Sequence, residues 1–307
     1  MKDIKKIILV LYILFSLQPV AFYSQLASSE TEEALTMVYS KKIFPNIDFR
    51  DAVASIEIWT KTLMSEINPK FSFTNVFIEG IDRVDEQLIN EDASFLILTA
   101  IEYLTNREKL KNMVPALLSS DDEGTIGIQY ILIVHRNSKI NSLRDLKNKT
   151  ISFVDDYQNE LPHLWVNVLL KSEGLPLADE FFKDIYIAQN ANQALLRTFF
   201  GQIDVCVVPH KLLNTSFVLN PQLESALAII KQSEPFIAGV FCANKNLSDG
   251  IIRDFIKSAK TAIKKDKGKQ VALFFRTKEI HDFQSKYLDN MKNLIEQANS
   301  FNIKLID

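Results

Sequence analysis

The amino-acid sequence predicts an α/β protein built from two similar lobes. Two segments, 71–100 and 184–209, show the same order of strand, polar loop, helix and strand. Between them, residues 141–175 add a further strand, polar loop and helix. Parallel strands joined by a crossover helix are the natural structure for such an order. We therefore expect one α/β lobe on each side of the central segment, each with a mostly parallel sheet flanked by helices.

The chain is expected to pass between these lobes twice. The first lobe begins with a predicted strand over 34–39 and a helix over 49–67. The long β-type segment 127–135 carries the chain out, and segment 235–243 brings it back. Three further helices should then pack on the first lobe, over 248–265, 268–277 and 285–301. Two crossings form a hinge rather than a single tether.

These crossings set the predicted domain boundaries. Residues 1–28 are a leader, 29–135 and 238–307 form the first lobe, and 136–237 form the second. The chain that remains after the leader is long enough for one large or two ordinary domains with a sizeable core.

The central segment carries the clearest local signals. Ser142 followed by Asp145 is a helix-capping pattern, and Asn148 can adopt the left-handed conformation that ends a helix. This predicts a one-turn helix over 142–147. Residues 150–154 are β-branched and aromatic, which favours a strand.

A polar loop over 155–160 follows that strand. Pro162 suits the first turn of a helix, and apolar residues at helical spacing continue until Gly174. Open α/β sheets bind small ligands at the carboxyl ends of their strands, where helix N-termini direct N–H groups outward. We therefore expect this loop to form one wall of a binding site.

The N-terminus has the layout of a secretory signal peptide. Lysines at positions 2, 5 and 6 precede an apolar run over 7–15, and Pro19 and several small residues follow it. An uncleaved anchor is the alternative, because residues 7–23 carry no charge. The leader contains no cysteine to carry a lipid anchor. We expect a free protein in the periplasm or outside the cell.

Composition and motifs exclude several classes of function. The net charge is −3 and the pI is about 5.9, which gives no electrostatic reason to bind nucleic acid or an acidic membrane surface. The chain contains no glycine-rich phosphate loop and no serine-hydrolase elbow. Its four histidines are far apart, so neither a metal site nor a cofactor is expected. Cys206 and Cys242 lie in apolar runs, which favours buried thiols, with a disulfide as the alternative.

Two segments resemble a known family. In the first, Leu143, Asp145, Leu146 and Lys149 match a motif that opens the second lobe of the phosphate/phosphonate-type periplasmic solute-binding proteins of ABC importers, which have the type 2 periplasmic-binding fold. Asn148 takes the place of the usual glycine in that motif. The second segment matches the strand that closes the lobe, through Ala194, Gly201 and Asp204. The similarity extends loosely over residues 34–298.

The resemblance implies a ligand site in a cleft between the lobes. Ser40 and Thr99 follow predicted strands and could contact a ligand or cap a helix. Tyr130 could line the cleft or pack in the core, and Asp204 could bind a ligand or stabilise a turn. The candidate ligand-binding residues are Ser40, Thr99, Tyr130, Asp156, Tyr157, Gln158 and Asp204.

The loop after residue 154 departs from the family pattern. Phosphonate binders of the family are expected to place a loop like Ser-Thr-Ser-Gly there, whereas this chain has Asp156 to Glu160, DYQNE. Carboxylates would compete with a phosphonate for the donors of the helix N-terminus. The loop thus predicts weak phosphonate binding and a neutral or amine-bearing solute, unless it is an ordinary acidic capping loop.

The resemblance implies a binding protein that delivers a small molecule to a membrane permease, with no enzymatic activity. Enzymes of the same fold, related to thiamine-pyrimidine synthase, use histidine and clustered cysteines with iron, and this chain lacks a cysteine cluster. An alternative is a sensory subunit that presents the bound solute to a sensor kinase or chemoreceptor. In either case we expect a monomer.

Overall fold

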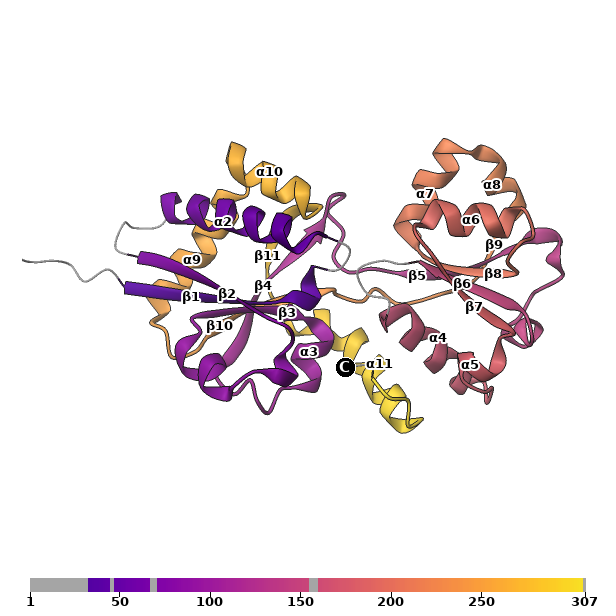
Figure 1. Ribbon diagram of the computed structural model, residues 1–307, viewed down its shortest axis with the longest axis horizontal. Coiled ribbons are helices and arrows are strands. Elements are labelled where there is room, and N and C mark those ends of the chain that lie inside the picture. The colour runs from indigo at the N-terminus through magenta and orange to yellow at the C-terminus, as the bar shows by residue number, and fades with distance from the viewer. Residues whose placement is uncertain (1–32, 45–46, 67–70, 155–159, 306–307) are drawn as a thin grey trace, which may run out of the picture.

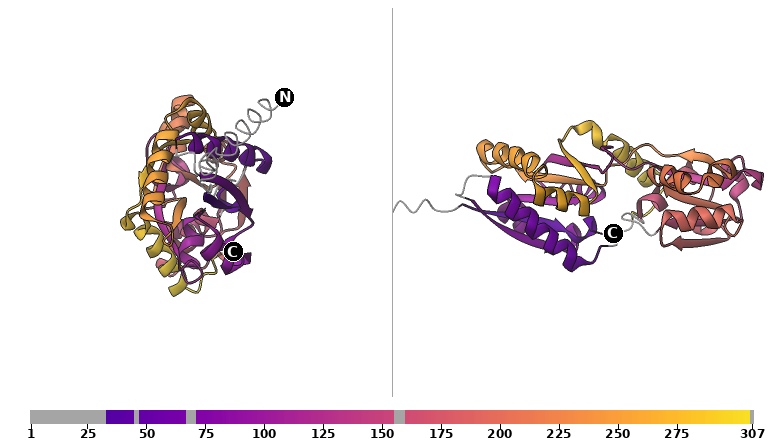
Figure 2. Two further views of the ribbon diagram at one scale, coloured as in Figure 1. Left: turned by 90° about the vertical axis from the view of Figure 1, so that its left-hand side faces the viewer. Right: turned by 90° about the horizontal axis from the view of Figure 1, so that it is seen from above.

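The computed structural model describes residues 33–44, 47–66, 71–154 and 160–305. Two lobes lie side by side along the long axis of the molecule, and each consists of a β-sheet between helices (Figure 1). The views from the side and from above show the same separation (Figure 2). The two-lobed α/β fold that the sequence predicts is confirmed, but the two sheets are mixed rather than mostly parallel, because each contains both parallel and antiparallel strand pairs.

The first lobe contains a mixed sheet of six strands in the order β11-β4-β10-β3-β1-β2. The pairs β2-β1 and β1-β3 are parallel. The pairs β3-β10, β10-β4 and β4-β11 are antiparallel. The strands are β1 Glu33–Ser40, β2 Phe71–Ile78, β3 Phe95–Thr99, β4 Met113–Asp121, β10 Gly239–Asn244 and β11 Thr277–Asp282.

The second lobe contains five strands in the order β7-β6-β8-β5-β9. Here β7, β6 and β8 are parallel, and β5 pairs antiparallel with both β8 and β9. The strands are β5 Tyr130–His135, β6 Thr150–Val154, β7 Asp184–Ala188, β8 Val205–Pro209 and β9 Leu227–Gln232.

Helices cover both faces of each sheet (Figure 1). The first lobe has α2 Phe49–Glu66, α3 Ala100–Thr105, α9 Asp249–Ala262 and α10 Asp266–Phe274. The second has α4 Glu160–Ser172, α5 Ala178–Phe181, α6 Ala191–Phe199, α7 His210–Leu219 and α8 Pro221–Ala226. The last helix is α11 Asp289–Ser300, and the single-turn helices are η2 Lys41–Ile43, η3 Ile81–Arg83, η4 Leu88–Asp92, η5 Arg136–Ser138, η6 Leu143–Leu146 and η7 Ser285–Leu288. Among the helices in these described segments, none is long and apolar enough to cross a membrane.

The alternation of side chains along β1 explains why its sheet is covered on both faces. Leu35, Met37 and Tyr39 pack in one core cluster with residues of α2 and α9. Val38 points to the other face and joins a separate cluster that also contains residues of α3. Successive side chains of a strand point to opposite faces, so an almost continuous apolar strand is buried on both. This second cluster continues into α4 and α11 and therefore extends under both lobes.

Several predicted elements of the central segment are confirmed. Ser142 and Asp145 form a reciprocal capping box at η6, and Asn148 has a positive φ of 58°. The predicted strand over 150–154 coincides with β6. Elsewhere, the helix predicted within segment 71–100 is present as the five-residue π-helix η4, preceded by the single turn η3. Strands β4, β9 and β11 were not predicted, because each acquires its partner from a distant part of the chain.

The two crossings between the lobes run side by side. Ile128 and Phe236 exchange backbone hydrogen bonds of 2.7 and 2.9 Å. Gly127 has a φ of +89°, and a Cβ atom there would lie 3.2 Å from the carbonyl oxygen of Phe236, so this close approach requires glycine. The sequence predicted that the first lobe extends to residue 135. Because β5 pairs within the second sheet, the chain instead leaves the first lobe before Tyr130.

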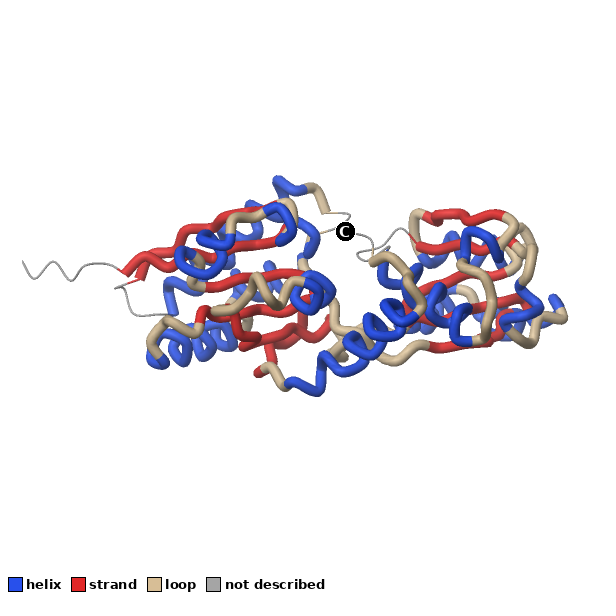
Figure 3. Tube along the Cα trace, turned by 90° about the horizontal axis from the view of Figure 1, so that it is seen from below, coloured by secondary structure: helices blue, strands red, loops and turns tan. Residues whose placement is uncertain are grey.

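Helix α11 forms a third connection. It packs on α3 of the first lobe and on α4 of the second, and Figure 3 shows it crossing between them. Asn290 donates a hydrogen bond of 3.0 Å to the carbonyl oxygen of Pro235 in the second crossing. The sequence predicted that this helix packs on the first lobe alone, but its apolar residues Leu294 and Ile295 join the cluster shared by both lobes.

Candidate functional site

The parallel strands of both sheets end toward the space between the lobes (Figure 1). In the first lobe these ends are Ser40, Ile78 and Thr99. In the second lobe the first residue of β5, Tyr130, pairs with the last residue of β8, Pro209. Carboxyl ends of parallel strands are the usual ligand-binding edge of an open α/β sheet.

A buried glutamate, Glu102, holds the first-lobe edge together. Its Oε1 accepts hydrogen bonds from Ser40 Oγ at 2.8 Å and from the N–H of Ile81 at 3.2 Å. Its Oε2 accepts from the N–H of Thr99 at 3.0 Å and from Thr99 Oγ1 at 3.2 Å. One carboxylate therefore joins the end of β1, the loop after β2 and the start of α3.

Two lysines follow Ser40 at this edge. Lys41 forms an ion pair with Glu79 and lies over the ring of Phe49, 4.5 Å from its centroid. The stem of Lys42 packs against Gly80, where an added Cβ would lie 3.0 Å from Lys42 Cε. The same Cβ would lie 3.4 Å from Glu102 Oε1, so Lys42 and Glu102 both approach the backbone at Gly80.

The second-lobe edge is largely apolar and tightly packed. Tyr130 is 1% exposed and belongs to the core cluster that extends under both lobes. Its N–H donates to Ser233 Oγ at 2.8 Å. The N–H of His210, the first residue of α7, donates to the carbonyl oxygen of Gln129 at 2.8 Å. Residues of both crossings thus fix this end of the second sheet.

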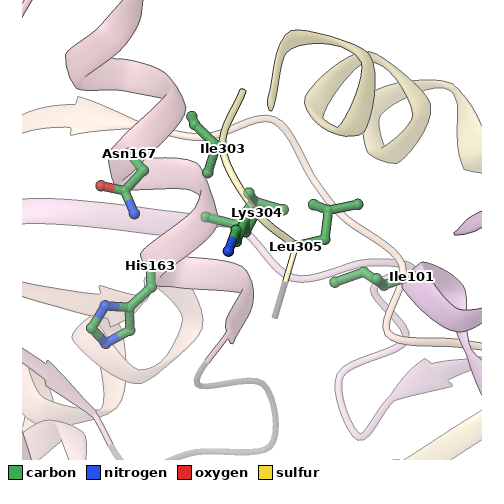
Figure 4. Close-up of a pocket in the computed structure, with 7 residues that line it drawn as sticks. Ile101, His163, Asn167, Ile303, Lys304 and Leu305 are labelled. Atoms are coloured by element: carbon green, nitrogen blue, oxygen red, sulfur yellow. The ribbon is translucent and has the colours of Figure 1, made fainter. Parts of the chain in front are cut away.

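A small, shallow hollow of about 30 Å³, open to solvent, lies between the lobes next to this edge (Figure 4). Ile101 of α3 lies on one side and His163 and Asn167 of α4 on the other, with the C-terminal segment between them. The lining residues are Ile101, His163, Leu164, Asn167, Ile303, Lys304 and Leu305. Both lobes and the C-terminal segment therefore contribute to one concave surface.

His163 is the titratable group with a shifted pKa in this hollow. Burial lowers its pKa, and the nearby negative charge of Asp179 opposes that effect. Its ring stacks on Phe153 with the centroids 3.6 Å apart. A neutral imidazole at this place can donate one hydrogen bond and accept another.

The described candidate residues occupy three different settings. Ser40 is fully buried beneath the strand ends, with its hydroxyl donated to Glu102. Thr99 is partly exposed and caps α3, so it lies at the predicted edge. Asp204 lies at the opposite edge, where it accepts hydrogen bonds from Thr150 N at 2.8 Å and Thr150 Oγ1 at 2.9 Å. Asp156, Tyr157 and Gln158 lie outside the described residues.

Sequence reasoning missed Glu102 and the residues of the hollow. A signal for Glu102 was present, since Thr99 with a glutamate three residues later is a capping-box pattern. No local pattern indicates Ile101, Asn167 or Leu305, because they meet only when α3, α4 and the C-terminal segment come together.

An ion pair connects the lobes on the hinge side. Lys211 of α7 donates to Asp121 Oδ2 at 3.0 Å and also contacts Asp122. The other oxygen of Asp121 accepts from the N–H groups of Glu123 and Thr125. Burial alone raises the pKa of Asp121, but the hydrogen bonds from Lys211, Thr125 and Glu123 outweigh it and the pKa is lowered.

The remaining candidate chemistry is limited. Cys206 and Cys242 are buried free thiols in different sheets. Burial raises the pKa of Cys206 to about 12, against a smaller opposing effect of a hydrogen bond with Thr198. Within the described ranges, no three His, Cys, Asp or Glu side chains gather as a metal site requires.

Solved structures with the same fold include several binding proteins. PhnD1 from Prochlorococcus marinus, in complex with methylphosphonate, is 14% identical with a TM-score of 0.54, and the match covers 89% of this chain and 100% of that one. A binding protein component of an ABC phosphonate transporter from Pseudomonas aeruginosa is 13% identical, with a TM-score of 0.55 and coverage of 89% of each chain. A Xanthomonas citri protein bound to ATP is 10% identical, with a TM-score of 0.59 and coverage of 88% and 98%. At these identities the likeness shows the fold.

The family follows from the sequence itself. No curated protein matches the chain. However, the model of a family described as the periplasmic substrate-binding protein of an ABC phosphonate transporter matches residues 43–287. This family consists of transport proteins rather than enzymes, and its description favours delivery to a permease over presentation to a sensor kinase. The chain therefore belongs to the family of periplasmic substrate-binding proteins of ABC phosphonate transporters.

Proposed function

We propose that this protein captures its solute between the two lobes, at the edge where the parallel strands end, and delivers it to an ABC permease. One observation carries the proposal: the strand ends of both sheets face the same space, beside a hollow that both lobes line (Figures 1 and 4). Small-molecule sites commonly lie in clefts between lobes that are apolar with a few polar groups.

The proposed contacts come from both lobes. Thr99 and Ile101 contribute from the first lobe, and His163 and Asn167 from the second. The loop containing Asp156, Tyr157 and Gln158 follows β6 in the sequence and remains part of the proposal. Ser40 supports the wall from beneath, whereas Asp204 is left out because it belongs to the opposite edge.

The proposal also places the mature protein in the periplasm as a monomer, after removal of residues 1–28. Two observations support this placement: the leader has lysines followed by an apolar run, as signal peptides do, and the family to which the chain belongs is periplasmic. N-terminal sequencing of the exported protein should find a start between residues 22 and 30. An intact Met1 in a soluble cytoplasmic fraction would contradict export.

A matched pair of variants tests the place of binding. Small molecules that co-purify with the native protein are identified by mass spectrometry and then titrated by calorimetry. Ile101→Trp fills the hollow and should weaken binding at least tenfold. Ile58→Trp makes the same change on an exposed position of α2 and should leave binding unchanged. Wild-type affinity in Ile101→Trp would refute the proposed site.

Ligand should also close the two lobes. A ligand that contacts both lobes binds the closed form more tightly, so it shifts the population toward that form. Small-angle scattering should therefore show a smaller radius of gyration on saturation of the wild-type protein. An unchanged radius would contradict capture between the lobes.

A further inference from the structure

The C-terminal segment brings a lysine into the hollow between the lobes. Ile303 is 6% exposed and belongs to the cluster shared by both lobes, and its N–H donates to the carbonyl oxygen of Ala298 at 2.9 Å. Leu305 packs against the same cluster. Lys304, between these two anchors, is exposed and lines the hollow (Figure 4). The segment therefore holds one cationic side chain where the lobes meet.

The charge of Lys304 is not balanced within the hollow. The lining contains no aspartate or glutamate, and no carboxylate among the described residues forms an ion pair with Lys304. An ammonium group has three N–H donors and no acceptor. Burial lowers the pKa of His163, so the imidazole beside it is largely neutral at neutral pH. The described lining thus has a positive surplus that comes from Lys304.

Helix α4 adds two donors to the same hollow. The Oδ1 atom of Asn167 accepts a hydrogen bond of 2.8 Å from the N–H of Ala178, which fixes the amide and leaves its N–H₂ group as the donor. No acceptor among the described residues takes a hydrogen bond from that N–H₂ group. His163 lies one turn earlier on the same helix face, and its neutral imidazole carries one N–H.

The size of the hollow suits one end of a solute. Its volume of about 30 Å³ leaves room for about two water-sized groups. An anionic head group such as a phosphonate presents several negatively charged oxygen atoms, and lysine ammonium and amide N–H groups bind such oxygens by charge-assisted or ordinary hydrogen bonds. The hollow can therefore take in oxygens of one head group while the rest of the solute lies between the lobes.

We infer that Lys304 is a specificity-determining residue: its ammonium group, together with the amide of Asn167, binds the anionic head group of the solute. The inference rests on the proposed function, because it assumes that the solute meets this hollow. It deepens that function by assigning the anion to a residue of the C-terminal segment. The loop after β6 predicts the opposite, a neutral or amine-bearing solute, so the titrations below decide between the two.

The variant Lys304→Met tests the inference, because it removes the ammonium group and keeps a long unbranched side chain. Calorimetric titration with methylphosphonate and with inorganic phosphate should show that the wild type binds at least one of these anions with a dissociation constant well below about 1 mM. Lys304→Met should weaken that binding by about tenfold or more. Added salt should lower the affinity of the wild type more than that of the variant.

Two further lysine variants serve as controls. Lys304→Arg keeps the positive charge and should retain most of the affinity. Lys269 is exposed on α10, on the other face of the first sheet from α3 (Figure 1), so Lys269→Met changes the net charge equally and should leave the affinity unchanged. An equal loss in Lys269→Met and Lys304→Met would show a general charge effect and overturn the inference.

Asn167→Asp is an independent test from the second lobe. The aspartate keeps an oxygen that accepts from the N–H of Ala178 and replaces the N–H₂ group by a second carboxylate oxygen. It should weaken binding of the anion by about tenfold or more, because a donor becomes a negative charge. Unchanged affinity in Asn167→Asp, with circular dichroism showing a folded protein, would overturn the role given to the amide.

The inference and the proposed function fail in different ways. Wild-type affinity in Lys304→Met, or a wild type that binds neither anion, overturns the inference. If Ile101→Trp then still weakens binding of the co-purified solute, capture between the lobes stands. If Ile101→Trp has no effect on the solute that binds, the proposed site itself fails.

Discussion

The two lobes share a topology but differ in chemistry at equivalent positions. Each has three parallel strands, β2-β1-β3 or β7-β6-β8, followed by an antiparallel strand that enters from a crossing. In the first lobe Thr99 ends the third strand and faces Gly239. In the second lobe Pro209 ends the third strand and faces Tyr130. The register therefore places Thr99 and Tyr130, both predicted from sequence, at the corresponding edges.

The helix that follows shows the difference most clearly. Thr99 caps α3 with its side chain and is tied to Glu102 three residues later. Pro209 precedes α7 without a side-chain cap, and Leu212 is the residue three positions later. The first lobe thus offers a polar, hydrogen-bonded wall and the second an aromatic and apolar one. Topology fixes where the edge lies, and side chains decide what it can bind.

Each lobe also uses one acidic residue to tie neighbouring strands. Glu102 ties strands at their carboxyl ends and is almost fully buried. Asp204 ties β6 and β8 at their amino ends, where its side chain is 36% exposed and lies 3.8 Å from Lys149 Nζ. The edge formed by the carboxyl ends of the parallel strands is therefore braced by a carboxylate in the first lobe only, as far as the described residues show.

The largest expected effect comes from removing these two carboxylates. Glu102→Ala leaves four donors buried without their acceptor and should lower the free energy of unfolding by about 3 kcal/mol. Asp204→Ala exposes its partners to water and should cost about 1 kcal/mol. Urea denaturation measures both. Equal losses would show that the two ties are equivalent.

The buried thiols, one in each lobe, should make stability fall at alkaline pH. Burial raises the pKa of Cys242, as it does that of Cys206, so the folded state keeps both protonated while the unfolded chain ionises above about pH 8.5. Their contribution is complete below that pH and is lost as the pH rises, by at most about 1.4 kcal/mol per thiol and pH unit. Denaturation at pH 8 and pH 9.5 tests the sign.

Replacing either thiol by alanine should flatten this pH dependence to a similar degree. Cys206→Ala and Cys242→Ala should each remove about half of the difference between pH 8 and 9.5, because both thiols are fully buried. In the native protein neither should react with a disulfide reagent until unfolding. Rapid reaction of one thiol would reveal that its lobe opens locally.

The ion pair between the lobes should have a smaller effect. A double-mutant cycle with Lys211→Met and Asp121→Asn should give a coupling energy of about 1 kcal/mol or less, since both side chains keep more than a quarter of their surface exposed. Asp121→Asn also changes the hydrogen bonds that Asp121 accepts from the N–H groups of Glu123 and Thr125. This change is the same in the single and the double variant, so it cancels in the cycle. A coupling near zero would mean that the pair does not hold the lobes together.

The smallest expected effect concerns His163 of the second lobe. Its folded pKa is lowered by burial, with Asp179 opposing, so below about pH 6.5 the unfolded state binds more protons than the folded state. The contribution is present above that pH and is lost as the pH falls. His163→Phe should reduce the loss of stability between pH 7 and 5.5. An unchanged profile would show that the imidazole stays solvated.

The sequence by itself determined the local elements and the repeated order of strands and helices. The strand over 150–154, the capping box of Ser142 and the turn at Asn148 follow from short-range preferences, because the interacting groups lie within a few residues. The family was likewise recognisable, since its motifs are short and continuous.

Only the tertiary structure decided which of the candidate residues share an edge. Ser40 is hidden because Glu102, 62 positions away, takes its hydroxyl, and Asp204 lies at the far edge because β8 runs parallel to β6. Likewise β5 belongs to the second sheet because it pairs with β8 and β9, which lie more than 60 residues further along the chain. Such pairings depend on contacts between distant segments, and no local pattern encodes which groups will meet.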